Sequence, residues 1–224
     1  MNLDLALRLL EIGTGFALLL RAAEHLRQDP RLFGPQGVAA ALLMIGEFRA
    51  FAAVSLWALS VWQLHRFQGP YNGGADKMAL LILTCLGVAH LVPSTYWQEL
   101  ALAYLAVQLV LSYFISGWVK LANPDWRSGQ ALSDVFAFSA YPVAENLRAL
   151  AARRSLLKAG SWAVIHLEVA FPLALLHPFA LIPALVATAL FHLANACLFG
   201  LNRFFWIWIA AYPALIWFQG RIGL

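Results

Sequence analysis

Lys120 is the residue of this 224-residue sequence whose position most clearly calls for a chemical explanation. It follows a run without charged residues from Leu100 to Val119, which is long enough for an apolar helix. An ammonium group at that depth in hydrocarbon is costly, so it either pairs with an anion or loses its proton. A neutral lysine acts as a base, whereas a lysine near a helix end can also extend its charge to the lipid headgroups. The sequence leaves both interpretations open.

A short polar segment directly after Lys120 contains a candidate partner for its ammonium group. Asp125 lies beyond Pro124, and a turn at this proline allows the carboxylate to fold back toward the lysine. Trp126 belongs to the same segment. A lysine paired with a carboxylate keeps its charge, whereas an unpaired buried lysine becomes a base.

Four further polar residues occupy apolar stretches in the last third of the sequence. His192 and Asn195 are three residues apart, so on a helix they share a face. His166 and Glu168 are two residues apart and cannot both point at one spot. Glu168 also precedes Pro172 by four residues, and this proline frees the carbonyl of residue 168 from its helical hydrogen bond. Such groups indicate either a site for a cofactor or hydrogen bonds between helices worth about 1 kcal/mol each.

The composition predicts an integral membrane protein. Apolar residues make up 62% of the sequence and charged residues only 12%, against about 25% charged residues in soluble domains. This much apolar surface has to face a lipid bilayer, so the bilayer is an expected partner of the protein. The net charge of +4 suits the cytoplasmic loops of a membrane protein and does not indicate nucleic acid binding. Cys85 and Cys197 lie in apolar runs and are expected to be packing residues, and no cluster has metal-ligand spacing.

The apolar runs predict an all-α fold, a polytopic transmembrane helical bundle in which residues 1–224 form a single domain. About seven spans are expected, over Leu5–Leu26, Val38–Leu64, Lys77–Val92, Trp97–Leu121, Trp162–Leu176, Phe179–Gly200 and Arg203–Phe218. Glycine and proline residues predict a turn over Gln28–Gln36 and a loop over His65–Lys77.

Two segments after the fourth span differ from the rest of the chain. Gly129–Tyr141 is too short to cross a bilayer, which predicts a re-entrant or interfacial segment. Ala144–Lys158 carries several basic residues among alanine and leucine. This pattern predicts an amphipathic helix lying on anionic lipid, with a soluble connector as the alternative.

Two separate motifs follow each other in the sequence. The first is Tyr113-Phe-Ile-Ser-Gly-Trp-Val-Lys120-Leu, with Asp125-Trp126 and Gly129 after it. The second is Phe191-His192-x-x-Asn195-x-x-Leu198-Phe199, with Phe204 further on. In order and spacing they resemble the signature of the vitamin K-dependent γ-glutamyl carboxylases and their bacterial relatives, the HTTM membrane family. The resemblance covers residues 75 to 218.

The resemblance implies a carboxylase-like enzyme in a bacterial inner membrane, acting on a peptide or a small substrate. Lys120 falls on the lysine that serves in the carboxylases as the base on vitamin K hydroquinone, a reduced quinone. Reaction with O2 then produces a strong base that removes a γ-proton from glutamate, and the carbanion captures CO2, so the site must exclude water. His192 is implied as a second catalytic residue. The residues implied in cofactor binding are Asn195, Asp125, Trp126, Glu168 and His166, and no metal is expected.

Two other functions stay open on the sequence alone. The first is a non-catalytic membrane partner in the maturation or export of a small peptide, because small bacterial relatives occur beside genes for exported peptides. The second is an electron carrier that reacts with a quinone and would depend wholly on that quinone. Lys120→Arg separates an enzyme from a partner protein, because arginine keeps the charge but removes the base.

Overall fold

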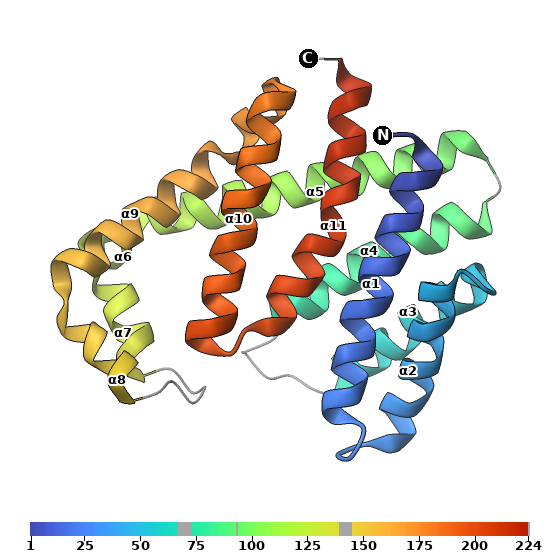
Figure 1. Cartoon of the computed structure of the whole chain (residues 1–224), viewed down its shortest axis with the longest axis horizontal. Coiled ribbons are helices and arrows are strands. Elements are labelled where there is room, and N and C mark those ends of the chain that lie inside the picture. Colours follow the sequence, from blue (N-terminus) through green and yellow to red (C-terminus); the bar gives the residue numbers. More distant parts are fainter. Residues whose placement is uncertain (67–72, 93, 139–144, 224) are drawn as a thin grey trace. The chain divides into compact units, whose positions relative to one another are not determined.

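The computed structural model describes residues 1–66, 73–92, 94–138 and 145–223, and these ranges contain helices and no strand (Figure 1). The all-α prediction is therefore confirmed. The helices are α1 (Leu3–His25), α2 (Pro30–Ile45), α3 (Arg49–Arg66), α4 (Gly73–Leu91), α5 (Thr95–Ala122), α6 (Pro124–Ser128), α7 (Gln130–Phe138), α8 (Glu145–Arg148), α9 (Arg154–Ala170), α10 (Pro178–Phe199) and α11 (Asn202–Ile222). The 3₁₀ segments η1 (Ala149–Ala152) and η2 (Phe171–Leu176) lie before and after α9.

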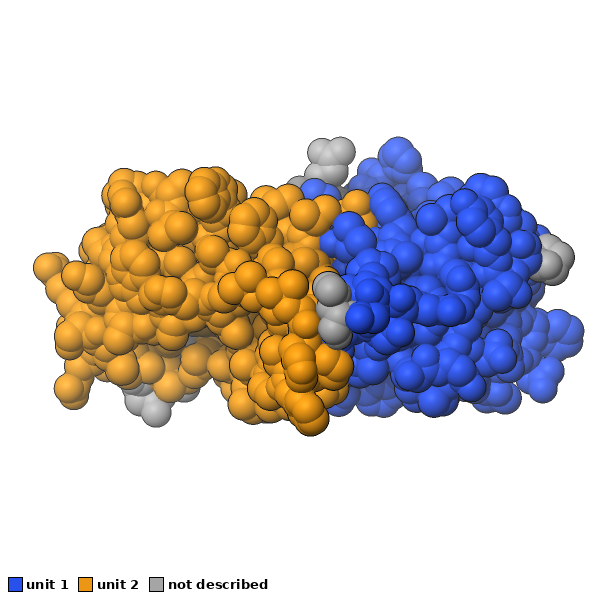
Figure 2. Space-filling model, turned by 90° about the horizontal axis from the view of Figure 1, so that it is seen from above, with its two compact units in different colours: residues 1–107, 206–223 blue, residues 108–205, 224 orange. Residues whose placement is uncertain are grey.

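The described helices fall into two compact units, which Figure 2 shows in blue and orange. Unit 1 contains residues 1–107 and 206–223, and unit 2 contains residues 108–205. Helix α5 supplies its first part to unit 1 and its second part to unit 2, whereas most of α11 belongs to unit 1. That the whole chain forms one transmembrane domain stays a prediction.

Four helical stretches in the described ranges are long and apolar enough to cross a bilayer. They are Gly74–Leu91, Thr95–Ala122, Arg154–Leu176 and Pro178–Phe199. Large apolar side chains on these stretches face outward, and Leu190 of α10, for example, is 59% exposed. Extended faces of this kind are unfavourable in water but suit hydrocarbon. The four stretches are therefore compatible with contact to a bilayer.

The single helix predicted over Val38–Leu64 is wrong, because the chain breaks between α2 and α3. Gly46 has a φ of 92°, a left-handed conformation that ends α2 and that glycine adopts without strain. The guanidinium group of Arg8 on α1 donates hydrogen bonds to the carbonyl oxygens of Leu43, at 3.1 Å, and Met44. These bonds satisfy carbonyl groups that the end of α2 leaves without helical partners.

The turn predicted over Gln28–Gln36 is wrong over most of its length, since α2 already begins at Pro30. The Asp29 carboxylate accepts a hydrogen bond from the amide of Leu32 at 3.2 Å and caps the helix. Proline suits the first helical turn because its missing N–H has no helical partner there. Pro30 therefore begins a helix instead of a longer loop, and Pro35 lies inside that helix.

A fully buried carboxylate joins three helices of unit 1. Glu11 on α1 lies 2.8 Å from Nη1 of Arg8 on the same helix. Arg49 on α3 and His90 on α4 approach the same carboxylate, at 3.6 and 2.9 Å. A carboxylate with several charged or polar donors forms stronger hydrogen bonds than a neutral acceptor. Glu11 therefore stabilises the packing of α3 and α4 against α1.

Glu11→Gln is expected to lower the free energy of unfolding by about 1–3 kcal/mol, because Arg8, Arg49 and His90 lose the charged acceptor that they share. Equilibrium unfolding in detergent micelles measures the change. The matched control is Glu47→Gln, which alters an exposed carboxylate and should stay within about 0.5 kcal/mol of the wild type. Equal losses in the two variants would contradict a stabilising role for Glu11.

Unit 2 packs α6 against α9 at a glycine. Gly129 ends α6 with a φ of 83°, and a Cβ atom at this position would lie 2.7 Å from the backbone of Lys158 on α9. The hydroxyl of Ser161 on α9 donates a hydrogen bond to the carbonyl oxygen of Trp126 on α6. The close backbone contact and the hydrogen bond together hold the short α6 helix against α9.

The segments predicted after the fourth span differ from their expected forms. Of Gly129–Tyr141, residues 130–138 form α7, and residues 139–144 lie outside the described ranges, so a re-entrant path stays a prediction. The amphipathic helix predicted over Ala144–Lys158 is wrong as one helix, because α8, η1 and α9 divide the described part. The chain leaves helical conformation at Arg153, where ψ is 63°. Residues 67–72 of the predicted loop His65–Lys77 also lie outside the described ranges. Pro93, further along the chain, lies outside them as well.

Candidate functional site

Lys120 and Glu168 form an ion pair in unit 2. The Nζ atom of Lys120, near the end of α5, lies 2.7 Å from Oε2 of Glu168 on α9. The side chain of Glu168 is 4% exposed and that of Lys120 is 15% exposed, so both charges are largely removed from the surface. Buried charges persist only when they are paired and hydrogen-bonded. Here the ammonium and the carboxylate are each other's partner.

Ser116 completes a triangle of hydrogen bonds with this pair. Its Oγ atom accepts a hydrogen bond from Nζ of Lys120 at 2.6 Å and donates one to Oε1 of Glu168 at 3.3 Å. Residues 116 and 120 are one helical turn apart, so their side chains are neighbours on α5. Both carboxylate oxygens of Glu168 are therefore hydrogen-bonded, one to an amine and one to a hydroxyl group.

Tyr113 and His192 form a second polar contact in unit 2. The hydroxyl oxygen of Tyr113 on α5 lies 2.9 Å from Nε2 of His192 on α10, and both side chains are buried. The ring of Phe171 in η2 packs against Tyr113, with ring centroids 4.3 Å apart. Tyr113 precedes Lys120 by two helical turns and lies on the same face of α5. This face therefore carries a phenol, a hydroxyl group and an amine in order.

Trp126 adds an aromatic face to the amine. Its ring centroid lies 5.2 Å from Nζ of Lys120, a distance that allows a cation–π interaction. The side chain of Asn123 caps α6 by accepting a hydrogen bond from the amide of Asp125 at 2.9 Å. With Pro124 in the first turn, this cap starts α6 directly after α5 and so places Trp126 beside Lys120.

A glycine permits the close approach of α5 and α9 beside the ion pair. A Cβ atom on Gly117 would lie 2.7 Å from both the Cβ atom of Glu168 and the backbone nitrogen of Val169. Helices in lipid use such small residues because their backbones can then pack closely. Gly117 therefore sets the distance between the two helices that carry Lys120 and Glu168.

Gly117→Ala is expected to lower the free energy of unfolding by about 1–3 kcal/mol, because the added methyl group overpacks the contact between α5 and α9. Thermal unfolding in detergent micelles measures the loss. Gly87→Ala on α4 is the matched control, since a Cβ atom there meets no other atom within 4 Å. Alanine is the better helix former, so this control should be neutral or stabilising by about 0.5–1 kcal/mol. Similar effects of the two changes would show that Gly117 does not limit the helix distance.

A comparison with models of protein families finds the HTTM domain over residues 90–219. The matched range covers more than half of the chain and includes Tyr113, Lys120, Glu168 and His192. The chain belongs to the HTTM family. Searches of curated proteins and of solved structures found no significant match. Together with the four apolar helical stretches, the family assignment identifies this HTTM protein as an integral membrane protein.

The HTTM protein brings several of the predicted site residues together. Lys120 contacts Trp126 and Glu168, and His192 contacts Tyr113 on the same face of α5. Asp125, which the sequence offered as the partner of Lys120, is instead exposed in the first turn of α6. The carboxylate beside the amine comes from α9, far along the chain.

Asn195 and His166 occupy different surroundings. Asn195 is half-buried, one turn after His192 on α10. His166 is exposed, and its Nδ1 atom lies 2.8 Å from the carbonyl oxygen of Trp162, one turn earlier on α9. Since Glu168 is buried on the same helix, residues 166 and 168 point in different directions, as their spacing predicted. The structure therefore does not bring His166 to the Lys120–Glu168 pair.

Two residues of this polar face were not among the predicted site residues. Tyr113 and Ser116 lie in the first motif, seven and four positions before Lys120. That spacing places all three on one side of a helix and was the available signal. Single tyrosines and serines are common packing residues in apolar helices, so their spacing alone does not indicate a site. The contacts of Tyr113 with His192 and of Ser116 with Glu168 make them candidates.

Proposed function

We propose that this HTTM protein is a membrane enzyme that takes a proton from a quinol-type lipophile at the Lys120–Glu168 pair. The observation that supports the proposal best is the 2.7 Å contact between an amine and a carboxylate inside apolar helical stretches. Ionisable residues in membrane-spanning segments are rare, and they commonly mark proton relays or ligand sites.

The pair can act as a base although its resting state is an ion pair. Burial disfavours both charges, so transfer of a proton from the ammonium to the carboxylate costs less here than in water. Once Glu168 holds that proton, Lys120 is a neutral amine that can take a proton from a ligand. The transfer runs directly between Nζ of Lys120 and Oε2 of Glu168, which are 2.7 Å apart, and needs no third side chain.

The chemistry of these residues fits a quinol. The Lys120–Glu168 pair suits an acidic hydroxyl group, and Tyr113 with His192 offers a second hydrogen-bonding position. The rings of Trp126 and Phe171 suit a flat apolar ring. A reduced vitamin K-type quinone, together with O2 and CO2, would supply carboxylase-like chemistry toward glutamate in a peptide. The residues of this chain would bind the oxygens of the ligand, store its proton and keep water away.

The proposal includes about seven spans in the inner membrane of a bacterium, with α2 and α3 in place of the single span expected over Val38–Leu64. α1 carries charged residues, but Glu11 is paired with Arg8 and Arg49, so its charge does not exclude insertion. α1 and α11 contain 23 and 21 residues, enough to cross about 30 Å of hydrocarbon. Labelling of single introduced cysteines with a membrane-impermeant reagent, from each side of sealed vesicles, tests this topology.

A second candidate function is that of a non-catalytic membrane partner in the maturation or export of a small peptide. The close contact at Gly117 favours it, because the Lys120–Glu168 pair also joins α5 to α9 and would serve there as packing alone. In that function the pair needs a positive charge at position 120 but no base. Lys120→Arg would then preserve the function.

Lipid extraction of the purified protein, followed by mass spectrometry, tests whether a quinone is bound. The wild type is expected to carry quinone in excess of the surrounding lipid. The double variant Lys120→Met/Glu168→Leu is the control, because it removes both charges with side chains of similar size and should still fold. Wild-type protein without quinone, or equal amounts in the double variant, would contradict the proposal.

A further inference from the structure

Ser116 has a geometry that the proposed proton transfer does not use. Its Oγ atom lies 2.6 Å from Nζ of Lys120, and this nitrogen lies 2.7 Å from Oε2 of Glu168. A hydroxyl group within hydrogen-bond distance of an amine that a third group orients matches the serine–lysine variants of nucleophilic catalysis, in which the neutral amine is the base. We propose that Ser116 is a nucleophile for acyl transfer, with Lys120 as its base and Glu168 as the residue that orients Lys120.

The orientation of the Ser116 hydroxyl group distinguishes it from other hydroxyl groups on these helices. Ser112, one turn earlier on α5, donates its hydroxyl hydrogen to the carbonyl oxygen of Leu109 at 2.7 Å. Thr188 on α10 does the same to Ala184 at 2.9 Å. Such bonding to the preceding turn is the usual arrangement inside a helix. The hydroxyl of Ser116 instead accepts a hydrogen bond from Lys120 and donates one to Glu168, so it bonds to two ionisable side chains and not to the backbone. This places it within reach of a candidate base.

The proposed step replaces one ester bond with another. Once Lys120 is neutral, the hydroxyl group of Ser116 turns its hydrogen from Oε1 of Glu168 to Nζ of Lys120. The proton of Oγ then moves to this neutral amine, Oγ bonds to the carbonyl carbon of an ester, and the bond from that carbon to the leaving oxygen breaks. The leaving oxygen takes the proton from Lys120 and departs as an alcohol. Water then adds to the acyl-serine, which releases a carboxylic acid and restores the hydroxyl group. The inference shares with the proposed function only the neutral form of Lys120.

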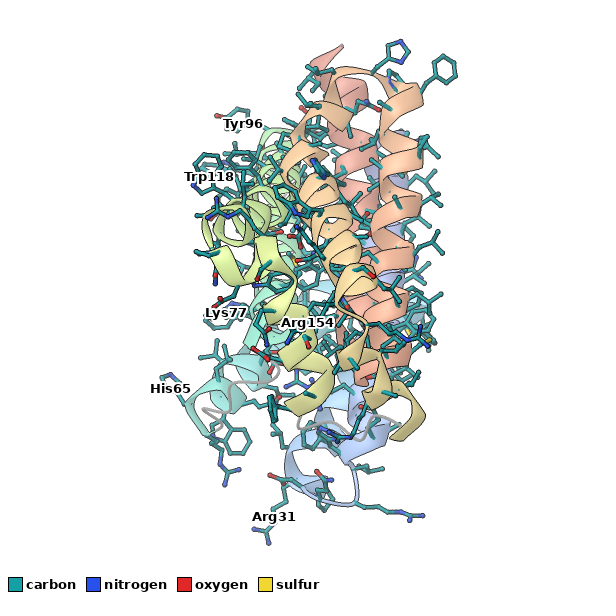
Figure 3. The ribbon with its side chains drawn as sticks, turned by 90° about the vertical axis from the view of Figure 1, so that its left-hand side faces the viewer. Arg31, His65, Lys77, Tyr96, Trp118 and Arg154 are labelled. Carbon is teal, nitrogen blue, oxygen red and sulfur yellow. The ribbon has the colours of Figure 1, made fainter. Side chains whose placement is uncertain are left out.

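The surroundings of Ser116 indicate an ester with a long apolar chain. Ser116 is half-buried beside a face of α5 on which Ile115, Trp118 and Val119 are exposed. Trp118 is 56% exposed and points away from the ribbon (Figure 3). Because α5 is one of the stretches that suit a bilayer, this face meets hydrocarbon, and a substrate that reaches Ser116 along it comes from the lipid phase. The substrate class is therefore a lipid-soluble acyl ester.

Labelling with an alkyl fluorophosphonate, a probe that reacts with nucleophilic serines, tests the inference on the full chain in lipid nanodiscs. Peptide mass spectrometry is expected to find the phosphonate on Ser116. Lys120→Arg should slow this labelling by about 10²- to 10⁴-fold, the usual contribution of a general base. Ser112→Ala is the matched control on the same helix and should be labelled at the wild-type rate. An unlabelled Ser116 in folded wild-type protein, or an unchanged rate in Lys120→Arg, would overturn the inference.

Ser116→Ala separates this inference from the proposed function. Alanine removes the nucleophile but leaves Lys120 and Glu168 able to pair, so bound quinone should remain while phosphonate labelling disappears. Labelling of Ser116 in a wild type that binds no quinone would support acyl transfer and contradict the quinol proposal. Labelling that persists at another residue of Ser116→Ala at the wild-type rate would count against Ser116 as the nucleophile.

Discussion

Glu168→Leu is expected to lower the free energy of unfolding by about 3–5 kcal/mol, the usual effect of breaking a buried ion pair from one side. The ammonium of Lys120 would remain among apolar helices with Ser116 and Trp126 but without its carboxylate. Neither a hydroxyl oxygen nor an aromatic ring replaces a full negative charge at 2.7 Å. Reversible denaturant unfolding in mixed micelles of detergent and lipid measures the difference.

The double variant Lys120→Met/Glu168→Leu distinguishes lost charge pairing from lost packing. It removes both charges and leaves apolar side chains of similar size, so its stability is expected to equal or exceed that of the wild type. Recovery of this kind would show that the loss in Glu168→Leu comes from the unpaired ammonium. If the double variant is as unstable as Glu168→Leu, the unpaired ammonium is not the cause of the lost stability. Lys120 and Glu168 would then not form an ion pair in the resting protein, and lost packing would explain the effect.

Lys120→Arg is expected to lower quinol-dependent turnover by about 10²- to 10⁴-fold. Arginine keeps the positive charge and can still bond to Glu168, but it does not release its proton in proteins. The variant should therefore fold normally and lack the base. Oxygen uptake by the purified protein supplied with a reduced quinone measures turnover, and thermal unfolding checks the fold.

Ser112→Ala serves as the control for this assay, because Ser112 bonds to the backbone of its own helix and is expected to leave turnover unchanged. Wild-type turnover in Lys120→Arg would contradict a base at position 120. Retained peptide maturation in that variant would favour the partner function, because a packing contact between α5 and α9 needs only the charge.

Local signals in the sequence were sufficient to predict several of the helices. The spans predicted over Trp97–Leu121 and Phe179–Gly200 correspond closely to α5 and α10. Apolar runs and the proline or glycine residues that bound them act within a few positions, so they can be read without the fold. The break at Gly46 was missed because a single glycine in an apolar run costs a helix only about 1 kcal/mol. Its effect here depends on Arg8, which belongs to another helix.

The partner of Lys120 depends on the tertiary structure. Asp125 is near in the sequence, whereas Glu168 is 48 positions away. Two features decide between them, since α6 starts at Pro124 with Asp125 exposed, and Gly117 lets α9 approach α5. Neither feature follows from residue spacing alone. The contact of Tyr113 with His192 joins the two family motifs. Like the contact of Lys120 with Glu168, it depends on how the helices pack and cannot be predicted from either motif alone.

Difference infrared spectroscopy during addition of a quinol tests most directly whether the Lys120–Glu168 pair takes a proton from its ligand. The resting ion pair contains a carboxylate, and uptake of one proton leaves an ammonium and a carboxylic acid. A carbonyl stretching band of a protonated carboxyl group is therefore expected to appear in the wild type and to be missing from Glu168→Gln. A wild-type spectrum without that band, or the same band in Glu168→Gln, would contradict the proposal.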